Sequence, residues 1–279
     1  MRYIVNKIKI VVDSSSDLIE LPNAEFASAP LKIVTSENEY VDDKNLNVEQ
    51  MVETLYNYKG KSSTSCPNVN DWLDAFKDAE EIFCITMTSN LSGTYNSACV
   101  AKKVYREKYP ERRVNVIDSL STGPEIALMV ENIRDMIHEN KDFDQISNTM
   151  KNYKTELLFA LKSMKNLANN GRVSKLKAAA AGVLGIRAIG KASEQGTLEM
   201  LSKCRGEAKT IKSLVKYMIE NGYKGGKAKI THCLNSPAAA KLAERIKSHF
   251  PGAIISIAET RGLCSFYAEK GGLLLGYEV

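Results

Sequence analysis

Short apolar runs alternate with stretches of helical periodicity along the first half of the chain. The apolar runs with the β-branched and aromatic content of buried strands lie at residues 7–12, 27–34, 82–87 and 113–117. Helical periodicity follows at residues 48–58, 70–77, 94 onward and 126–137, with Asn70 as the expected cap of the second helix. Strands that alternate with helices in this way predict parallel strands with right-handed crossovers, an α/β fold.

The alternation of apolar runs with stretches of helical periodicity changes around Tyr153. Residues 183–189 and 197–202 are expected to pair as antiparallel strands around Gln195-Gly196, and residues 175–181 read as a small-residue helix. Further strands are expected at 157–161, 228–231 and 253–257, with helices around 211–218 and 237–249. We therefore expect a two-domain protein: a parallel-sheet α/β/α domain over residues 1–155, a mixed α+β domain over 156–279, and a ligand cleft between them.

Three strands of the first domain end in loops rich in serine and threonine. The loops begin at Asp13, Thr88 and Asp118, and the second of them, within residues 82–98, leads directly into a helix N-terminus. Ligands of open parallel sheets lie at the carboxyl ends of the strands, and the first turn of a helix offers free N–H groups to an anion. Ordinary capping is the alternative for one such loop, but three of them favour an anion site.

Composition narrows the class of protein. The hydrophobic content is 44% and the charged content 25%, as in an ordinary soluble globular protein, and no apolar run approaches the ~20 residues of a membrane span. The first residues read as a strand rather than a signal peptide, so a cytoplasmic location is expected. The net charge of +5 comes from scattered Lys and Arg, which does not favour nucleic-acid binding.

Six cysteines and three histidines are dispersed without metal-ligand spacing, so no metal site is expected. Common catalytic and nucleotide-binding motifs are absent. Asp13 could serve as an aspartyl nucleophile, but its position favours a role as hydrogen-bonding organiser of its loop. Hydroxyl groups without a nearby base favour binding over catalysis, so no catalytic residue is assigned. A phosphoryl- or acyl-transfer enzyme that uses Asp13 or Ser92 remains the alternative.

Several segments in order along the chain resemble the motifs of the DegV family, which includes the fatty-acid-binding proteins called FakB. The strongest are DSSSDL at 13–18, TSCP at 64–67 and TSNLSGTYNSA at 88–98; the weaker are IDSLSTG at 117–123, NGRVSKLKAAAAGVLGIR at 170–187 and SKCRGEAK at 202–209. The resemblance implies two α/β domains with a long-chain, palmitate-like fatty acid between them and no cofactor. In relatives that work with a fatty acid kinase, it implies presentation of the acid for phosphorylation.

The resemblance also implies roles for individual residues. Thr64 and Ser92 match the hydroxyl groups that hold the lipid carboxylate, with Ser65 beside them, and Gly93 permits close backbone approach. Two arginines, Arg172 and Arg205, match basic residues that face the head group or a kinase, with an ordinary ion pair as the alternative for each. Asp13 and Ser119 are expected to support the site. Transient contact with a membrane surface is compatible with this role.

One departure from the family pattern concerns the head group. The family usually ends in HTGPG, and alignment of its last glycine with Gly272 places Ala268 at the histidine. Lys270 is the nearby group that could compensate, and Asn68 stands where the family has a second serine. A lipid carrier is thus the leading hypothesis. A regulatory or interaction protein with a structural lipid is a third reading, beside the enzyme.

Overall fold

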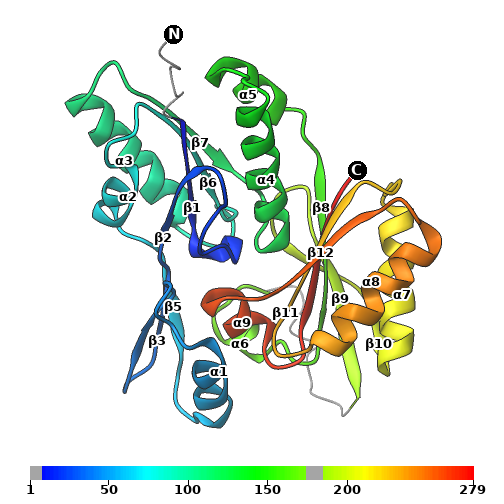
Figure 1. The fold of residues 1–279 in the computed structure, drawn as a ribbon. Helices are drawn as coiled ribbons and strands as arrows, with labels where there is room; N and C mark the ends of the chain where they lie inside the picture. The colour runs from blue at the N-terminus through cyan, green and yellow to red at the C-terminus, as the bar shows by residue number, and fades with distance from the viewer. Residues whose placement is uncertain (1–7, 174–184) are drawn as a thin grey trace.

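The computed structural model describes residues 8–173 and 185–279. A four-stranded sheet lies in the first half of the chain and a six-stranded sheet in the second (Figure 1). The four-stranded sheet consists of β1 (Ile8–Asp13), β2 (Glu25–Ala29), β6 (Glu81–Thr86) and β7 (Arg113–Asp118). All its strands are parallel, in the order β2-β1-β6-β7, as the alternation of strands and helices predicts.

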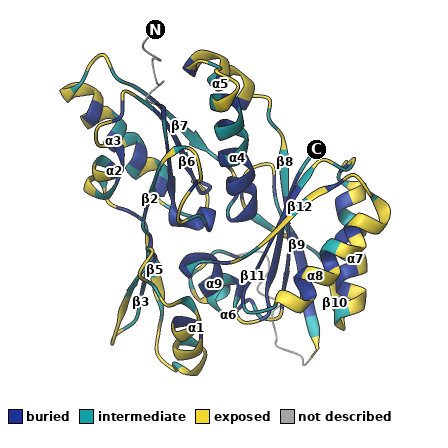
Figure 2. Ribbon diagram, viewed as in Figure 1, coloured by how far each residue is buried: buried dark blue, intermediate teal, exposed yellow. Residues whose placement is uncertain are grey.

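Helices cover both faces of this sheet. Its helices are α2 (Val69–Phe76), α3 (Thr94–Lys108), α4 (Pro124–His138) and α5 (Phe143–Met150). Within β1, Ile10 and Val12 pack in the cluster with α4 and α5, whereas Val11 packs in the cluster with α2 and α3. Because successive strand residues point to opposite faces, these contacts bury β1 on both sides, and Figure 2 shows the strand as largely buried. The arrangement confirms the predicted α/β/α layers.

A small third sheet was not predicted. It contains β3 (Lys32–Val34), β4 (Glu39–Val41) and β5 (Ser63–Ser65), and helix α1 (Val48–Asn57) lies between β4 and β5 in the sequence. The expected single strand at 27–34 is wrong, because the segment divides between β2 and β3. Pro30 lies between the two strands and has no N–H to donate to a ladder. Strand β5 lies in the polar stretch between the helices predicted at 48–58 and 70–77, where no strand was expected.

The cap of α2 also differs from the expectation. Asn68, not Asn70, precedes the helix, and its side chain accepts hydrogen bonds from the N–H groups of Asn70 and Asp71. The Asp71 carboxylate accepts the N–H of Asn68 in return, which completes a capping box. Asn68 therefore serves the helix at the position where the family pattern has a serine.

The six-stranded sheet is mixed, as predicted. Its strands are β8 (Thr155–Leu161), β9 (Ile186–Ala192), β10 (Leu198–Arg205), β11 (Lys227–His232), β12 (Ile254–Glu259) and β13 (Leu273–Glu278). The order is β10-β9-β8-β13-β11-β12, and only β11 and β12 pair in parallel. The predicted antiparallel pairing around Gln195-Gly196 is confirmed in β9 and β10. The helix predicted at 175–181 and the start of the strand predicted at 183–189 lie outside the described residues.

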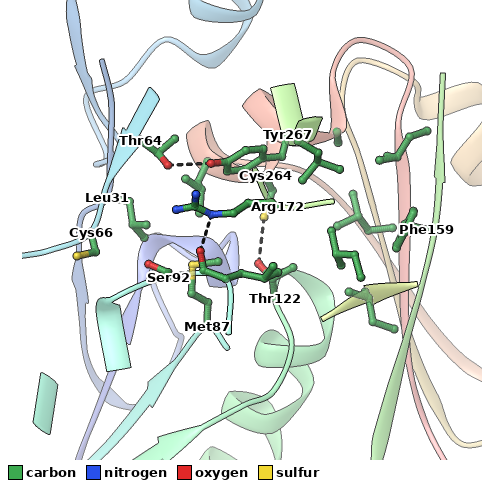
Figure 3. A pocket seen from close by; sticks show the side chains of 18 of the residues that line it. Leu31, Thr64, Cys66, Met87, Ser92, Thr122, Phe159, Arg172, Cys264 and Tyr267 are labelled. Carbon is green, nitrogen blue, oxygen red and sulfur yellow. Dashed lines mark hydrogen bonds between the residues drawn. The ribbon is translucent and has the colours of Figure 1, made fainter. Parts of the chain in front are cut away.

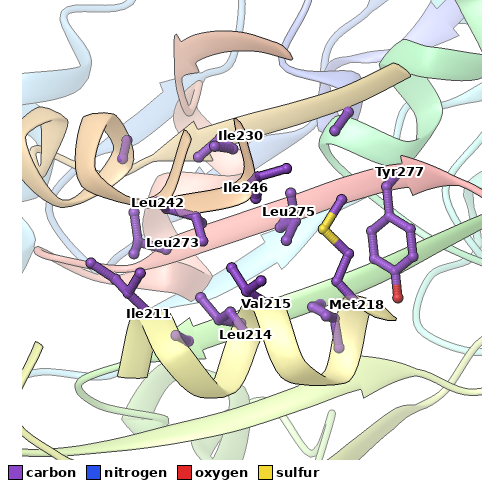
Figure 4. Packing of buried hydrophobic residues seen from close by; sticks show 14 of the residues in the cluster. Ile211, Leu214, Val215, Met218, Ile230, Leu242, Ile246, Leu273, Leu275 and Tyr277 are labelled. Carbon is purple, nitrogen blue, oxygen red and sulfur yellow. The ribbon is translucent and has the colours of Figure 1, made fainter. Parts of the chain in front are cut away.

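The described residues of this half contain the helices α6 (Lys165–Asn169), α7 (Glu207–Glu220), α8 (Ser236–His249) and α9 (Gly262–Ala268). Apolar side chains of α7 and α8 pack on one face of the sheet, where Leu214 and Leu242 are fully buried (Figure 4). On β8, Leu158 faces this cluster, whereas Leu157 and Phe159 belong to a cluster on the opposite face. The opposite face of β8 is thus available to line a cavity. None of the helices within 8–173 and 185–279 is long and apolar enough to cross a membrane.

The strands of the first sheet end by residue 118 and those of the mixed sheet begin at residue 155, with α4 and α5 between them. Helix α4 also contacts β8, β11 and β13, so it packs against both sheets. A domain boundary at residue 155 stays a prediction.

The first turn of α9 is attached to the N-terminal half by carboxylates. Asp42 accepts the N–H groups of Gly262 and Leu263 at 2.7 and 2.8 Å, and Asp17 accepts the N–H of Arg261 at 2.7 Å. Both carboxyl groups are buried. Free N–H groups at a helix start carry partial positive charge, so acceptors placed there stabilise the helix. The attachment fixes the position of α9 relative to the parallel-sheet half.

Burial, together with a smaller effect of the neighbouring Asp42, raises the pKa of Asp17 to about 7, although the N–H of Arg261 lowers it. In the unfolded chain an Asp has a pKa of about 3.9. The folded state therefore binds more protons between these two values, so the free energy of unfolding falls as the pH rises from about 4 to 7.

Asp17→Asn keeps an acceptor for Arg261 but carries no charge. We expect this variant to lose less stability than the wild type between pH 4 and 7, by on the order of 1–4 kcal/mol, in urea denaturation. Asp74→Asn, at an exposed carboxylate paired with Lys77, is the control and should retain the wild-type slope. If the free energy of unfolding of Asp17→Asn depends on pH as that of the wild type does, the raised pKa does not belong to Asp17.

Candidate functional site

A cavity of about 290 Å³ lies between the two halves of the chain. Strands of the mixed sheet, loops that follow the parallel strands, β5 and α9 enclose it, and most of the side chains that line it are apolar. The apolar side chains are Leu31, Met87, Leu91, Leu157, Phe159, Leu161, Leu167, Leu198, Leu263, Ala268 and Leu274. A largely apolar cavity with a few polar groups is the usual form of a small-molecule site.

Polar groups gather at one end of this cavity, where Thr64, Ser65, Ser92, Gly93 and Arg172 all contribute to the lining. The five come from β5, from the loop after β6 and from the segment after α6. Figure 3 shows Thr64, Ser92 and Arg172 at the same end, with Phe159 at the opposite side. The sequence placed these five residues near the head group of a ligand, and the structure brings them together.

Tyr267 of α9 is a further polar residue at this end, and it was not predicted from the sequence. Its hydroxyl group lies 2.8 Å from the Thr64 hydroxyl, and the two are joined by a hydrogen bond (Figure 3). Burial raises the pKa of Tyr267, so the phenol is protonated at neutral pH and can donate. Ala268, the residue at the family histidine, lines the cavity wall beside it. A tyrosine next to the missing histidine was the available signal.

Arg172 is the charged group of this end. Its Nε donates to the carbonyl of Leu91 at 2.7 Å, and its Nη1 donates to the carbonyl of Asn170. Within the described chain no carboxylate forms an ion pair with it. The surface or interdomain ion pair that the sequence left open is thus not found among these residues. A partly buried guanidinium without an anionic partner favours an anion in the cavity.

Ser92 and Gly93 place the start of α3 at the same end. Gly93 is the N-cap residue and supplies no side chain to the first turn, while Ser92 Oγ accepts the N–H of Thr94 at 3.3 Å. A Cβ atom at Gly93 would lie 3.5 Å from Cys66 Sγ, an ordinary contact. The first turn of α3 therefore adds positive potential and N–H groups to the hydroxyls.

Asp13 organises the loops beneath this end. Its carboxylate accepts the N–H of Ser15 at 3.1 Å, the N–H of Met87 at 2.8 Å and the hydroxyl of Thr94 at 3.2 Å. Burial raises its pKa, and these hydrogen bonds oppose the shift. Asp13 is fully buried and does not line the cavity. It joins the ends of β1 and β6 to α3, in line with the hydrogen-bonding role expected for its loop, whereas a supporting role in ligand binding stays a prediction.

Three other predicted residues lie apart from the cavity. Ser119 lines a second cavity of about 530 Å³ with α4 and β8. Arg205, at the end of β10, and Lys270, in the turn after α9, are exposed. Lys270 does not line the cavity, and Tyr267 supplies the nearer polar group in place of the missing histidine. A partner-facing role for Arg205 and Lys270 stays a prediction.

The hydrogen bonds of the histidines lie outside the cavity. His138 contacts the carbonyl of Asn23, His232 accepts the N–H of Asn235, and His249 contacts Arg245. None of the three lines the cavity. In the part of the chain that the structure describes, no cluster of His, Cys, Asp and Glu could hold a metal ion. Because hydroxyl groups and a guanidinium lie at one end of an apolar cavity, the site can bind an amphipathic anion whose apolar tail lies opposite its charged end.

Comparison with known proteins supports a family assignment. A family model described as an uncharacterised protein of the DegV family matches residues 7–278. A DegV domain-containing protein of Streptococcus pneumoniae is 44% identical over 277 residues, which cover 97% of this chain and 99% of the relative.

Two solved structures match the fold closely. A DegV family protein from Eubacterium eligens, loaded with heptadecanoic acid, has a TM-score of 0.95 and 44% identity, covering 98% of this chain and 99% of the other. The Fatty Acid Kinase (Fak) B3 protein of Streptococcus pneumoniae, loaded with linoleic acid, matches with the same TM-score, identity and coverage. On its motifs, fold and relatives, this chain belongs to the DegV family.

Proposed function

We propose that this protein binds one long-chain fatty acid in the cavity between its two halves and acts as its carrier. The guanidinium of Arg172 has no carboxylate partner among the described residues and lies beside the hydroxyl groups of Thr64, Ser92 and Tyr267 at one end of an apolar cavity. This arrangement carries the proposal. The carboxylate accepts hydrogen bonds from these groups and from the first turn of α3 at Gly93. Ser65 lies beside them at the cavity mouth.

The two ends of the ligand contribute differently to the binding free energy. Burial of an alkyl tail stabilises the complex by roughly 0.8 kcal/mol per methylene, or about 10 kcal/mol for a dozen carbons before ordering costs. Each charge-assisted hydrogen bond contributes about 1.5–3 kcal/mol net. The tail therefore sets most of the affinity, and the head group sets the orientation. The heptadecanoic and linoleic acids in the two similar structures support a ligand of this size.

A carrier role includes transfer of the acid to other proteins. The similar Fatty Acid Kinase B3 protein supports a fatty acid kinase as the partner that receives the head group. Exposed Arg205 and Lys270 are the basic residues that we assign to the surface facing such a partner. The proposal includes a cytoplasmic location, brief contact with membrane surfaces during loading, and domains over residues 1–155 and 156–279. Binding and presentation need no catalysis by this chain.

The direct test is to extract the purified protein under denaturing conditions and identify its lipid by mass spectrometry. We expect about one fatty acid per chain, because a tail of a dozen or more carbons dissociates slowly from an apolar cavity. Protein that carries no fatty acid and does not take up added acid would contradict the proposal.

Removal of two head-group hydroxyls should weaken binding. We expect Thr64→Ala with Ser92→Ala to raise the Kd for a fatty acid by ~10- to 100-fold, because two hydrogen bonds to the carboxylate are lost and water replaces part of them. Titration with a fluorescent fatty acid measures the Kd, and thermal unfolding checks the fold. The control is Ser248→Ala, whose hydroxyl contacts Arg245 on an exposed helix end. Unchanged affinity in the double variant would remove the carboxylate assignment.

Tyr267→Phe tests the residue that stands beside the missing histidine. It removes one hydroxyl and leaves the ring, so we expect Kd to rise by about 3- to 10-fold, the range of one net hydrogen bond. Tyr223→Phe makes the same change in the core of the mixed sheet, where the hydroxyl donates to the Gly226 carbonyl. It should leave Kd unchanged. If the two variants bind equally well, Tyr267 does not contact the head group.

A further inference from the structure

The cavity has a defined apolar end formed by β8. Leu157, Phe159 and Leu161 alternate along this strand and face the cavity, while the residues between them face the α7 and α8 side. Among these, Phe159 lies at the side of the cavity opposite Thr64 and Ser92 (Figure 3). A tail that starts at the hydroxyls of those two residues therefore runs toward the Phe159 ring.

The position of the Phe159 ring depends on a glycine in the neighbouring strand. Gly190 of β9 is directly opposite Phe159 in the antiparallel ladder. A Cβ atom at Gly190 would lie 2.2 Å from Cζ and 2.7 Å from Cε2 of the Phe159 ring, and 2.3 Å from the carbonyl oxygen of Glu199. These distances are far below van der Waals contact, so the ring occupies the space that a side chain at position 190 would fill.

Gly190 leaves the space on β9 that the Phe159 ring occupies. Glycine in the interior of a strand weakens the strand and marks a place where another group approaches closely. Here the missing side chain lets the ring approach the strand closely, and a cross-strand aromatic on a glycine recovers apolar contact. Any side chain at position 190 would push the ring off the strand and toward the space that the tail occupies.

We infer that Phe159, positioned by Gly190, sets the maximum length of the acyl chain that this protein accepts. The inference rests on the proposed fatty-acid function and deepens it by assigning the residues that select among chain lengths. A longer tail would have to displace a ring that is only 4% exposed and lies directly against the β9 backbone. Displacing such a ring into packed surroundings is unfavourable.

The test is competition among saturated fatty acids for delipidated protein, followed by extraction and mass spectrometry. An equimolar mixture of chains of about 12 to 20 carbons samples tails from well below to above the expected length. Phe159→Leu replaces the ring with a smaller apolar side chain and so lengthens the cavity at its apolar end. We expect the preferred acyl-chain length to rise by about two carbons. Gly190→Ala drives the ring into the cavity, and we expect the preferred length to fall by a similar amount.

Two controls separate chain selection from loss of stability. Phe83→Leu makes the same change at a buried ring that packs in the parallel-sheet half and does not line the cavity. Gly252→Ala adds a methyl group where nothing lies within 4 Å. Both should retain the wild-type length profile.

The outcomes are distinct. If Gly190→Ala does not fold because of its contact with Glu199, the Phe159→Leu profile decides the matter alone. A Phe159→Leu profile identical to that of the wild type would overturn the length assignment while leaving fatty-acid binding intact. A wild-type protein that binds none of the acids would instead overturn the proposed function.

Discussion

Two buried carboxylates hold the start of α9, and the rest of the site depends on that attachment. Asp17 and Asp42 belong to the parallel-sheet half, whereas the N–H groups that they accept belong to the C-terminal half. The same short helix ends in Tyr267 and Ala268, both of which line the cavity. Burying carboxyl groups is unfavourable unless hydrogen bonds satisfy them, so the protein places them where a helix supplies free N–H groups. The cavity can form only when the two halves meet at this helix.

The head-group end follows from that constraint. The hydroxyl groups of Thr64 and Tyr267 meet only because α9 is docked, and Arg172 reaches the same place from the C-terminal half by donating to the Leu91 carbonyl. Each half therefore supplies part of the anion site and part of the apolar wall. Because of this division, neither half alone encloses the cavity. The loops that the N-terminal half contributes are held together by the hydrogen bonds that Asp13 accepts.

Local sequence signals predicted the parts of the fold that local physics decides. The serine- and threonine-rich strand ends identified the loops at the sheet edge. The resemblance to the family, rather than the local pattern, indicated Thr64, Ser92 and Arg172, which all line one cavity. The division of 27–34 was missed because apolar character does not reveal that Pro30 ends one sheet and a second sheet begins. Tyr267 was missed because its partner lies 203 residues away, a contact that only tertiary closure creates. Tyr267 stands directly before Ala268 in the sequence, but only the fold shows that its hydroxyl group reaches Thr64.

The central claim is that an ionised carboxylate lies among these hydroxyls and the Arg172 guanidinium. The most direct measurement is the ¹³C signal of carboxyl-labelled palmitate in complex with the protein, followed as the pH is lowered. Hydrogen bonds and a cation favour the charged form, so the bound signal should keep its ionised shift below the ordinary carboxyl pKa of about 4.3. A bound carboxyl that titrates at or above that value would contradict the account.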